Sequence, residues 1–290
     1  MKLKHIAGIK AKIHIHSNKK TGNLFDGSYK SVYEGNGLDF ENLREYIPGD
    51  NIRDIDWKSS SRSGKMLVKR YVAEKKHNVM LVWDCGKKMS GHTMKLEKKH
   101  GIAVTAGGII GYMAARNGDN VGAVYNQNGM IQYHEMRTGE NNIERLLSFY
   151  DKEGQAEYAS DLEKSLAFIV KNMQRRMIIF VITDERGLYD VTEDTLKKLV
   201  NRHNVIFLRI SDAQYTGSKG FHVESNRYIP EFFTRNRRLR KSEEKMREKL
   251  AQANEKKLVY YRVASAVIEK EDELVEKIVA LLATHRHMNS

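Results

Sequence analysis

The stretch VMLVWDCGKKMSG, Val79 to Gly91, begins with five apolar residues, which are followed by an aspartate and a more polar segment. An apolar run of this length without alternation predicts a strand that is buried on both faces of a sheet. A second run, MIIFVIT from Met177 to Thr183, has the same character and is also followed by an aspartate. These two runs predict the central strands of a sheet.

Around these runs, from Val79 onward, short apolar strands alternate with longer helical segments. The patterns predict four further strands, in VGAVYN, MIQYHEM, NVIFLRI and LVYYRV, and helices over about 95–117, 140–150, 161–174, 192–203, 237–255 and 271–285. VGAVYN and MIQYHEM are expected to pair through a turn at 127–129. The small residues Gly107, Gly108 and Gly111 are expected to permit close approach of the first helix to the sheet. The alternation predicts an α/β protein with a mainly parallel, six-stranded sheet and helices on both faces.

The first 76 residues have a different pattern, with strands and turns expected. In KAKIHIH, Lys10 to His16, apolar residues alternate with Lys and His, which predicts a half-buried strand. His14 and His16 share one face of that strand, and we interpret them as solvent-facing because no further metal ligands lie nearby. The sequence thus predicts a smaller β-rich N-terminal segment over 1–76 and an α/β domain over 77–290.

Composition excludes several classes of protein. The 290 residues are 40% hydrophobic and 30% charged, without low-complexity tracts, which excludes disorder and fibrous repeats. The single cysteine, Cys85, has no internal disulfide partner, so a reducing, cytoplasmic location is expected. The longest apolar run, 101–115, is shorter than the ~20 residues that a spanning helix needs. No transmembrane segment and no signal peptide are expected.

The formal net charge of +13 raises the alternative of a basic polyanion- or nucleic-acid-binding module. The densest basic cluster is TRNRRLRKSEEKMREKL, 234–250, which contains Arg235, Arg237, Arg238 and Arg240. Leu239, Met246 and Leu250 follow at helical spacing, so we interpret the cluster as the solvated face of a helix. Any binding to nucleic acid through it is expected to be loose and unselective.

The carboxyl ends of central strands in open α/β sheets are where ligands bind. Asp84 and Asp184 follow the two central runs, and Ser160 is expected to cap a helix. Two strand-end aspartates and a hydroxyl resemble the metal-ion-dependent adhesion site of the von Willebrand factor A domain, in which the first strand runs into D-x-S-x-S. The resemblance implies metal ligands at these positions, with Ser160 in place of a threonine.

This chain departs from that pattern, because Gly86 and Lys88 stand at the two serine positions. Magnesium prefers six oxygen ligands, whereas glycine offers no side-chain oxygen and a lysine ammonium repels a cation and pairs with carboxylates. We therefore expect a degenerate site that holds no divalent metal tightly. Helix capping and turn formation are the alternative roles for the two aspartates.

The segment 27–76 contains REYIPGDNIRDIDW, 44–57, which is dense in both charged and apolar residues. It resembles the signature of a bacterial and archaeal family known as domain of unknown function fifty-eight, which carries a von Willebrand factor A-like domain. The matching positions are Gly35, Gly37, Asp39, Phe40, Arg44, Tyr46, Gly49, Asp50, Arg53, Ile55, Asp56, Trp57 and Arg62, with Ser61 where the family usually has Ala. The resemblance extends over nearly the whole chain.

The signature predicts an internal charge network. Arg44, Arg53 and Arg62 are expected to pair with Asp50, Asp54 and Asp56. Ile52, Ile55 and Trp57 are expected to bury against the α/β domain and hold the pairs at the seam between the two parts of the chain. An exposed surface for recognition of a partner is the alternative.

No enzyme is predicted. The sequence has no Walker-type phosphate loop and no nucleophile elbow, and no histidine is placed to activate Cys85. The family resemblance implies a link with MoxR-type AAA+ ATPases and a role in assembly or maturation of other proteins. We therefore expect a non-enzymatic adaptor or scaffold without cofactor.

Overall fold

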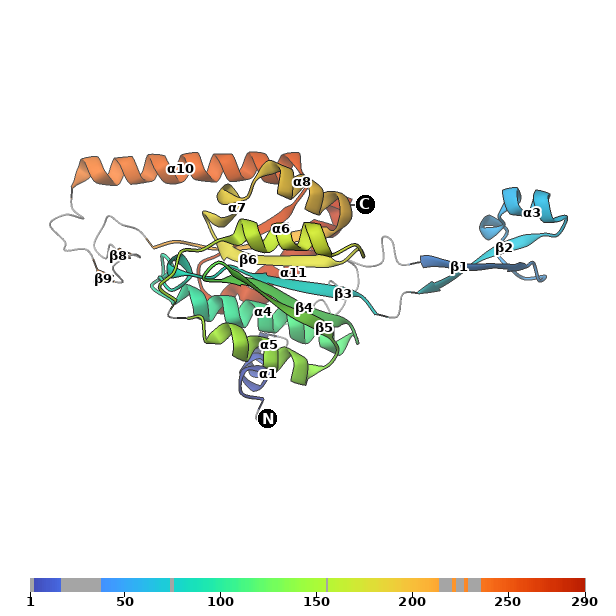
Figure 1. Cartoon of the computed structure of the whole chain (residues 1–290), viewed down its shortest axis with the longest axis horizontal. Coiled ribbons are helices and arrows are strands. Elements are labelled where there is room, and N and C mark those ends of the chain that lie inside the picture. Colours follow the sequence, from blue (N-terminus) through green and yellow to red (C-terminus); the bar gives the residue numbers. More distant parts are fainter. Residues whose placement is uncertain are drawn as a thin grey trace.

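The computed structural model describes residues 3–16, 38–73, 76–154, 156–213, 221–222, 227–228 and 236–289. Its main part is a six-stranded sheet with helices on both faces (Figure 1). The strand order is β10-β7-β6-β3-β4-β5, and every neighbouring pair is parallel except β4 and β5. The strands are β3 (Asn78–Trp83), β4 (Asn120–Gln127), β5 (Met130–Arg137), β6 (Ile178–Asp184), β7 (Asn204–Ile210) and β10 (Ala264–Ile268). This arrangement confirms the predicted α/β class with a mainly parallel, six-stranded sheet and helices on both faces.

The apolar run of β3 is buried on both sides of the sheet. Val79, Leu81 and Trp83 face one core, and Met80 and Val82 face the other. The first core lies under α1 (Lys4–His16), α4 (Lys99–Arg116), α5 (Glu140–Asp151) and α11 (Leu274–Asn289). The second lies under α6 (Leu162–Asn172), α7 (Gly187–Asp190), α8 (Glu193–Arg202) and the end of α10 (Arg237–Tyr260). A strand with two apolar faces therefore becomes the centre of a three-layer domain.

Glycines allow α4 to pack closely on its neighbours. A Cβ on Gly107 would lie 2.2 Å from the Trp83 ring, so this position touches the sheet. Gly108 and Gly111 instead face Ile9 of α1 and Ile143 of α5. Of the three glycines expected to face the sheet, Gly107 alone does so. The other two allow α1 and α5 to pack closely on α4.

The predicted turn between β4 and β5 is confirmed. Asn128 and Gly129 both have positive φ, at 49° and 86°. Such a pair is favoured in tight two-residue hairpins because its twist matches that of the strands.

Two sequence predictions of strands are wrong. Residues 10–16 belong to helix α1, in which Ile6, Ile9 and Ile13 recur at helical spacing and enter the first core. The backbone N–H groups of His5 and Ile6 donate to Glu144 of α5, at 3.1 and 2.9 Å, which anchors the start of α1. His14 is exposed on this helix, and the side chain of His16 lies outside the description.

LVYYRV does not form a strand either, because α10 continues to Tyr260. A turn follows in which Arg262 has φ 51°, and the edge strand β10 begins only at Ala264. The apolar residue Leu258 is buried as part of the helix, against the second core. The apolar and aromatic run thus belongs to a helix end rather than to the sheet edge.

The family signature lies on a separate hairpin. Strands β1 (Leu38–Glu45) and β2 (Leu67–Ala73) pair antiparallel, and η2 (Ile52–Asp54) and α3 (Trp57–Ser63) connect them. Figure 1 shows this hairpin projecting from the end of the molecule, clear of the sheet. Gly35 and Gly37, which also match the signature, lie outside the described residues.

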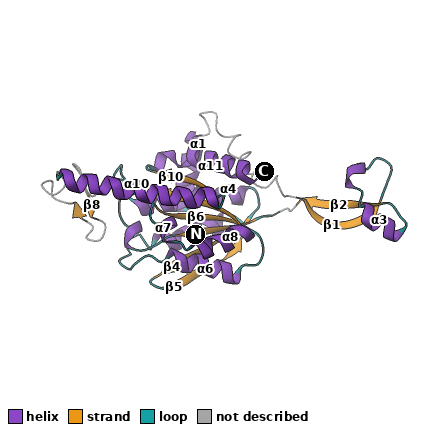
Figure 2. Cartoon of the chain, turned by 90° about the horizontal axis from the view of Figure 1, so that it is seen from above, coloured by secondary structure: helices purple, strands orange, loops and turns teal. Residues whose placement is uncertain are grey.

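The remaining elements are short: η3 (Lys87–Met89), η4 (Glu271–Glu273), and the antiparallel pair of β8 (Phe221–His222) and β9 (Arg227–Tyr228). Viewed from above, α10 runs along one face of the sheet and extends beyond the ends of its strands (Figure 2). Among the described residues, no helix combines the length and apolar character needed to cross a membrane.

Candidate functional site

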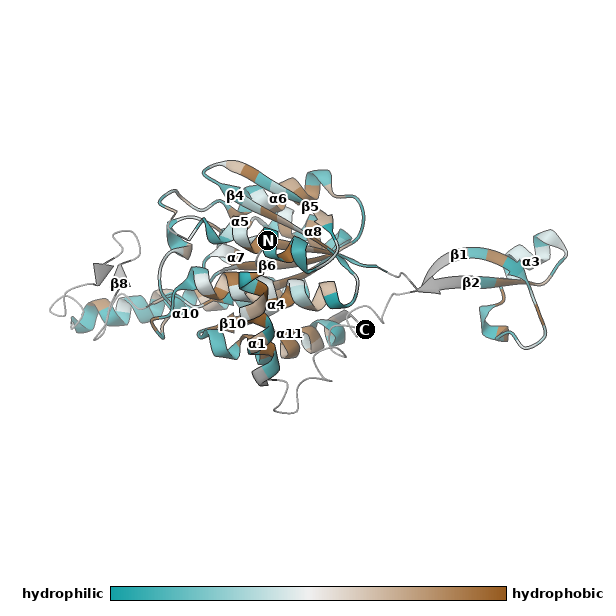
Figure 3. Ribbon diagram, turned by 90° about the horizontal axis from the view of Figure 1, so that it is seen from below, coloured by the Kyte–Doolittle hydropathy of each residue, from teal (hydrophilic) through white to brown (hydrophobic). Residues whose placement is uncertain are grey.

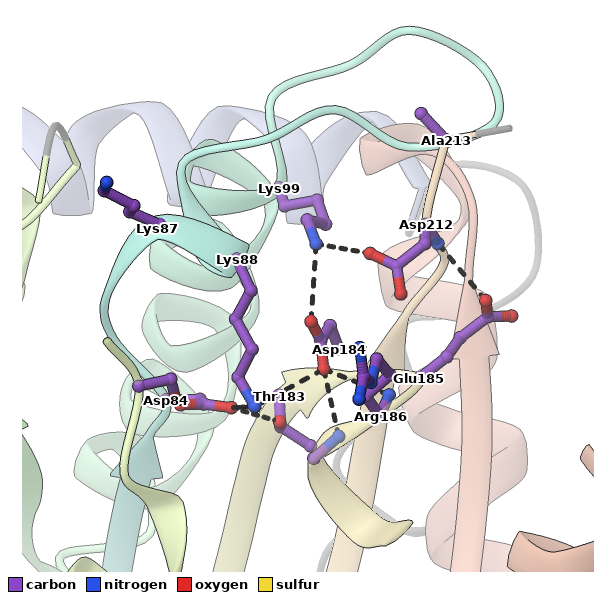
Figure 4. Close-up of polar contacts among 12 residues, drawn as sticks. Asp84, Lys87, Lys88, Lys99, Thr183, Asp184, Glu185, Arg186, Asp212 and Ala213 are labelled. Carbon is purple, nitrogen blue, oxygen red and sulfur yellow. Dashed lines mark hydrogen bonds and ion pairs between the residues drawn. The ribbon is translucent and has the colours of Figure 1, made fainter. Parts of the chain in front are cut away.

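Charged side chains gather where the central strands β3, β6 and β7 end. Asp84 follows β3, Asp184 ends β6, and Asp212 follows β7. Lys88 comes from η3, and Lys99 is the first residue of α4. Figure 4 shows the two lysines pointing toward these carboxylates, and we call the five residues the rim cluster.

Asp84 is buried, and four groups contact its carboxylate. Thr183 Oγ1 donates to Oδ2 at 2.6 Å, and the Cys85 N–H donates to Oδ1 at 2.9 Å. Ser160 Oγ also donates to Oδ1. The Lys88 ammonium lies 3.0 Å from Oδ2. The structure therefore brings Ser160 to Asp84, and it adds Thr183, which the sequence analysis did not single out.

Asp184 is held ionised by its surroundings. Its Oδ1 accepts from the N–H groups of Arg186 and Gly187, at 3.1 and 2.9 Å. The Lys99 ammonium lies 3.5 Å from Oδ2, and Lys88 lies 3.7 Å from Oδ1. Burial acts to raise the pKa of Asp184, but the two ammonium groups and the backbone donors together lower it below the ordinary value.

Lys88 and Lys99 are charged for the same reason. Burial acts to lower each pKa, but the adjacent carboxylates raise both above the ordinary lysine value. Lys99 is fully buried, and it stands in the first turn of a helix, where the macrodipole disfavours a cation. Its charge is therefore stable there only because Asp184 and Asp212 pair with it.

The third carboxylate leaves the rim cluster with an excess of negative charge. Asp212 is paired with Lys99, yet burial and the nearby Asp184 raise the pKa of Asp212 to about 6. Two ammonium groups face three carboxylates, so one carboxylate titrates at a higher pH. Protonation of Asp212 would bring the cluster to neutrality.

Helix α10 is tied to the rim cluster through Arg247. The guanidinium donates to the backbone carbonyls of Asp212 and Ala213, at 2.8 and 2.7 Å. It also lies 3.8 Å from Glu185, the residue after Asp184. The basic helix is therefore anchored at the rim on one side.

The residues of the rim do not fit a magnesium site. Gly86 has φ 92°, and a Cβ there would lie 2.7 Å from the backbone of Ser160 and of Tyr158, so a serine cannot replace it without displacing that loop. The Lys88 ammonium contacts both Asp84 and Asp184, where a cation would need their oxygens. A divalent ion there would face the Lys88 ammonium in place of an oxygen ligand.

The signature residues on the hairpin form only part of the predicted network. Arg44 donates two hydrogen bonds to Asp50, at 2.7 and 2.6 Å, and Asp50 also accepts from the Ile47 N–H. The Arg44 hydrogen bonds are the main reason that the pKa of Asp50 is lowered. This bidentate pair closes the turn between β1 and η2.

Asp56 has a different partner from the one expected. Its carboxylate caps α3 by accepting from the Ser59 N–H at 3.0 Å, and Lys69 lies 3.9 Å away. Arg53 and Arg62 are exposed, and their side chains make no ion pair or hydrogen bond with the described residues.

The predicted burial of the signature against the α/β domain is wrong for all three apolar residues, and Ile55 is buried within the hairpin instead. Ile52 and Trp57 are 65% and 64% exposed, whereas Ile55 is 5% exposed and bridges to the buried Val68 of β2. The hairpin thus forms its own small apolar contact and leaves the larger side chains in solvent.

The basic cluster is confirmed as helical, within α10. Arg237, Arg238 and Arg240 are exposed, and Figure 3 shows α10 as hydrophilic over most of its length. Leu239 and Met246 are exposed as well, so the apolar stripe that was expected does not pack in this part of the helix. Arg235 lies outside the described residues.

The chain matches one protein-family model and is similar in sequence to uncharacterized mycobacterial proteins. The model of a family described as "Protein of unknown function DUF58" matches residues 42–219. The proteins Mb1516 of Mycobacterium bovis and Rv1480 of Mycobacterium tuberculosis, both described as uncharacterized, are each 24% identical to the chain over 196 residues. The match covers 67% of this chain and 61% of each relative, so the chain spans less than two thirds of their length.

Several solved structures are similar at low identity. The conserved hypothetical protein BatB from Bacteroides thetaiotaomicron has a TM-score of 0.44 at 13% identity, covering 72% of this chain and 98% of that one. An aerotolerance-related membrane protein from Bacteroides fragilis has 0.45 at 13% identity, covering 71% and 98%. A von Willebrand factor type A protein from Catenulispora acidiphila has 0.37 at 11% identity, covering 73% and 43%.

Proposed function

Since the chain belongs to the DUF58 family of proteins of unknown function, we propose that it is a non-enzymatic, cytoplasmic adaptor that binds other proteins. The observation that carries the proposal is the projecting hairpin, where Trp57 and Ile52 stand largely in solvent. Exposed large apolar side chains beside charged ones are typical of interaction surfaces. The signature of the family would then serve recognition of a partner.

The partner that we propose is a MoxR-type AAA+ ATPase, and the process is assembly or maturation of other proteins. Both come from the family resemblance. The rim cluster supports a role without catalysis, because its buried carboxylates are engaged by lysines of the same chain. Asp84 and Asp184, held by ammonium groups in this way, are poorly placed to act as general bases, and Asp212, whose pKa is raised to about 6, is the exception.

The test is direct binding between the full chain and the MoxR-type ATPase of the same genome, with ATP and with ADP. Complex formation is expected, and Trp57→Ser should weaken it by at least about tenfold, as for a central aromatic contact. Tyr260→Ser is the matched control, because Tyr260 is also an exposed aromatic residue but lies at the end of α10. Failure of wild type to bind in either nucleotide state would reject this partner.

We further propose that the rim works without metal, with Lys88 as a resident cation. Magnesium or EDTA should then leave the melting temperature of wild type unchanged. In Lys88→Ser, Asp84 and Asp184 lose an ammonium, so melting should fall, and magnesium should restore part of the loss. Micromolar magnesium binding to wild type, abolished by Asp84→Ala, would contradict this proposal.

A second candidate function, polyanion binding, is favoured by the exposed arginines of α10. Their side chains lie on a helix with acidic residues at nearby turns, such as Glu244, which pairs with Arg240 at 3.7 Å. Mixed charge of this kind favours weak attraction over specific recognition.

A further inference from the structure

The tip of the hairpin exposes three large apolar side chains. Ile47, Ile52 and Trp57 come from the turn after β1, from η2 and from the first turn of α3, and each is more than half exposed. The Ile55–Val68 contact inside the hairpin does not cover them. Apolar area of this kind remains unfavourably hydrated until another molecule covers it.

The charges of the same tip are not balanced. Three cations have acidic partners on the hairpin: Arg44 with Asp50, Lys65 with Glu45, and Lys69 with Asp56. Arg53, Lys58 and Arg62 have exposed side chains that contact no carboxylate of the described chain. Only Asp54 is left to oppose them, so the unpaired charge of the tip is positive.

The unpaired cations lie next to the apolar residues along the chain. Arg53 follows Ile52, and Lys58 follows Trp57. Lys58 and Arg62 are one helical turn apart and therefore share a face of α3. We define the hairpin tip as Ile47, Ile52, Arg53, Trp57, Lys58 and Arg62.

We infer that the hairpin tip binds an acidic protein segment that contains a large apolar side chain; this deepens the adaptor function proposed above. Trp57 and the isoleucines would cover the apolar residue, and the three cations would pair with carboxylates of the segment. Arginine suits this task because its planar guanidinium meets a carboxylate through two hydrogen bonds.

The composition of the tip favours a protein over a nucleic acid. Three cations of the hairpin are already paired with its own carboxylates, so the tip keeps only a small positive charge for the contacts that a phosphate backbone requires. Two of the three exposed apolar residues are isoleucines, which cannot stack on bases as aromatic rings do. Both features suit a mixed acidic and apolar peptide surface.

The experiment places a photo-crosslinking residue in the hairpin of the full chain, in cells of the source organism. Ser61 is replaced by p-benzoylphenylalanine, because Ser61 is exposed on α3 one turn after Trp57. The same residue at Met130, in the exposed β4–β5 turn, is the control position. Mass spectrometry identifies the crosslinked segment.

We expect the Ser61 position to crosslink to a segment of net negative charge with a large apolar residue, and the Met130 position not to. Arg53→Glu with Arg62→Glu should lower the crosslinked fraction by about tenfold or more. Lys171→Glu with Lys197→Glu is the matched control, since it changes the net charge equally at exposed lysines of the α/β domain. The control pair should leave the crosslinked fraction unchanged.

Crosslinks to nucleic acid, to a basic segment or to a second copy of this chain would overturn the inference, as would none at all. If the acidic segment belongs to a protein other than the ATPase, the inference stands and the proposed partner fails. If the ATPase binds the chain but charge reversal at the tip changes nothing, the inference fails and the adaptor function stands.

Discussion

At the scale of single residues, two lysine ammonium groups hold the three carboxylates of the rim cluster together. Lys88 lies between Asp84 and Asp184, and Lys99 lies between Asp184 and Asp212. Buried ion pairs contribute little net stability, because the loss of hydration offsets their attraction. Removal of one partner nevertheless destabilises the protein, because it leaves the other charge buried without compensation. The cluster is therefore most sensitive to the loss of its cations.

Lys99→Met should destabilise the protein by about 3–5 kcal/mol, because it leaves Asp184 and Asp212 without their shared ammonium. Urea unfolding of the full chain measures this difference. Lys98→Met is the control, since Lys98 is the exposed neighbour of Lys99 and should change stability by roughly 0.5 kcal/mol or less. Equal stability of the two variants would mean that Lys99 is not charged in the folded protein.

The stability of the protein should carry a pH dependence from Asp212. Its folded pKa of about 6 is raised above the ordinary 3.8, so the folded state binds a proton that the unfolded state has released. Asp212 therefore favours folding less and less as pH rises from about 4 to 6. In Asp212→Asn this component is absent, so its stability relative to wild type should increase with pH over that window.

The contribution of Asp212 is measured as the difference in unfolding free energy between wild type and Asp212→Asn. A difference is needed because buried histidines change the stability of the protein with pH in the opposite direction. Burial lowers the pKa of His203 to about 4, so its contribution is lost as pH falls below 6.5. A constant difference between wild type and Asp212→Asn from pH 4 to 7 would contradict a raised pKa at Asp212.

At the scale of elements, the hairpin is organised by local hydrogen bonds rather than by a core. Asp50 closes one turn and Asp56 caps α3, and Gly64 ends α3 in the left-handed region with φ 70°. The signature aspartates thus define the shape of the hairpin. The signature residues Arg53 and Trp57 remain available at its surface.

Asp56→Ala should loosen α3 without unfolding the α/β domain, because it removes the cap on the Ser59 N–H. Amide hydrogen exchange over 57–64 should accelerate by about fivefold, as expected for loss of an N-cap. Arg53→Ala should leave exchange in the same segment unchanged. Faster exchange in Arg53→Ala would reveal a structural contact of that arginine.

Helix α10 should bind polyanions loosely. Binding of a short DNA duplex should weaken steeply between low and physiological salt and show little preference for sequence. Arg237→Ala with Arg238→Ala should reduce the log–log salt slope by about 2, one for each lost phosphate contact. Fluorescence anisotropy measures both.

Lys171→Ala with Lys197→Ala is the charge-matched control for this helix, and should keep the slope of wild type. Tight, sequence-selective binding at physiological salt would instead favour a nucleic-acid-binding function over the adaptor.

At the scale of the whole molecule, the chain forms a packed α/β domain and a projecting hairpin. Helix α1 precedes the hairpin in sequence, yet Ile6, Ile9 and Ile13 pack in the first core. The α/β domain therefore contains chain from both sides of the hairpin. In β1 and β2 the first and last residues, Leu38 and Ala73, are paired, so the hairpin enters and leaves at one place.

A variant in which a short Gly-Ser linker replaces residues 38–73 should keep the α/β domain folded. The paired ends of the hairpin lie a few ångström apart, within reach of such a linker. Its melting temperature should differ from wild type by no more than about 2 °C, equivalent to less than ~1 kcal/mol at this size. A large loss of melting temperature would show that the hairpin contributes to the main core.

Local sequence patterns were sufficient to predict those elements whose conformation depends mainly on their own residues. The short apolar runs at 79–83 and 177–183 favour strands that are covered on both faces, and Asn128–Gly129 suits a tight turn by its backbone preferences alone. The ends of those strands also placed Asp84 and Asp184 at one edge of the sheet. Alternation misled at 10–16, where a helical stripe begun at Ile6 competes with the period of a strand.

Which distant side chains meet depends on how the elements pack around the sheet. Lys99 and Asp212 are 113 residues apart, and their pairing depends on the neighbouring positions of α4 and β7 around the sheet. The sequence does show that Lys99 lies on the apolar face of α4, one turn before Ile102 and Ala103, which indicates a buried lysine. Nothing in the sequence around Asp212 identifies it as the partner of that lysine. The exposure of Trp57 was likewise undecidable from its own sequence, because burial depends on whether another surface is within reach.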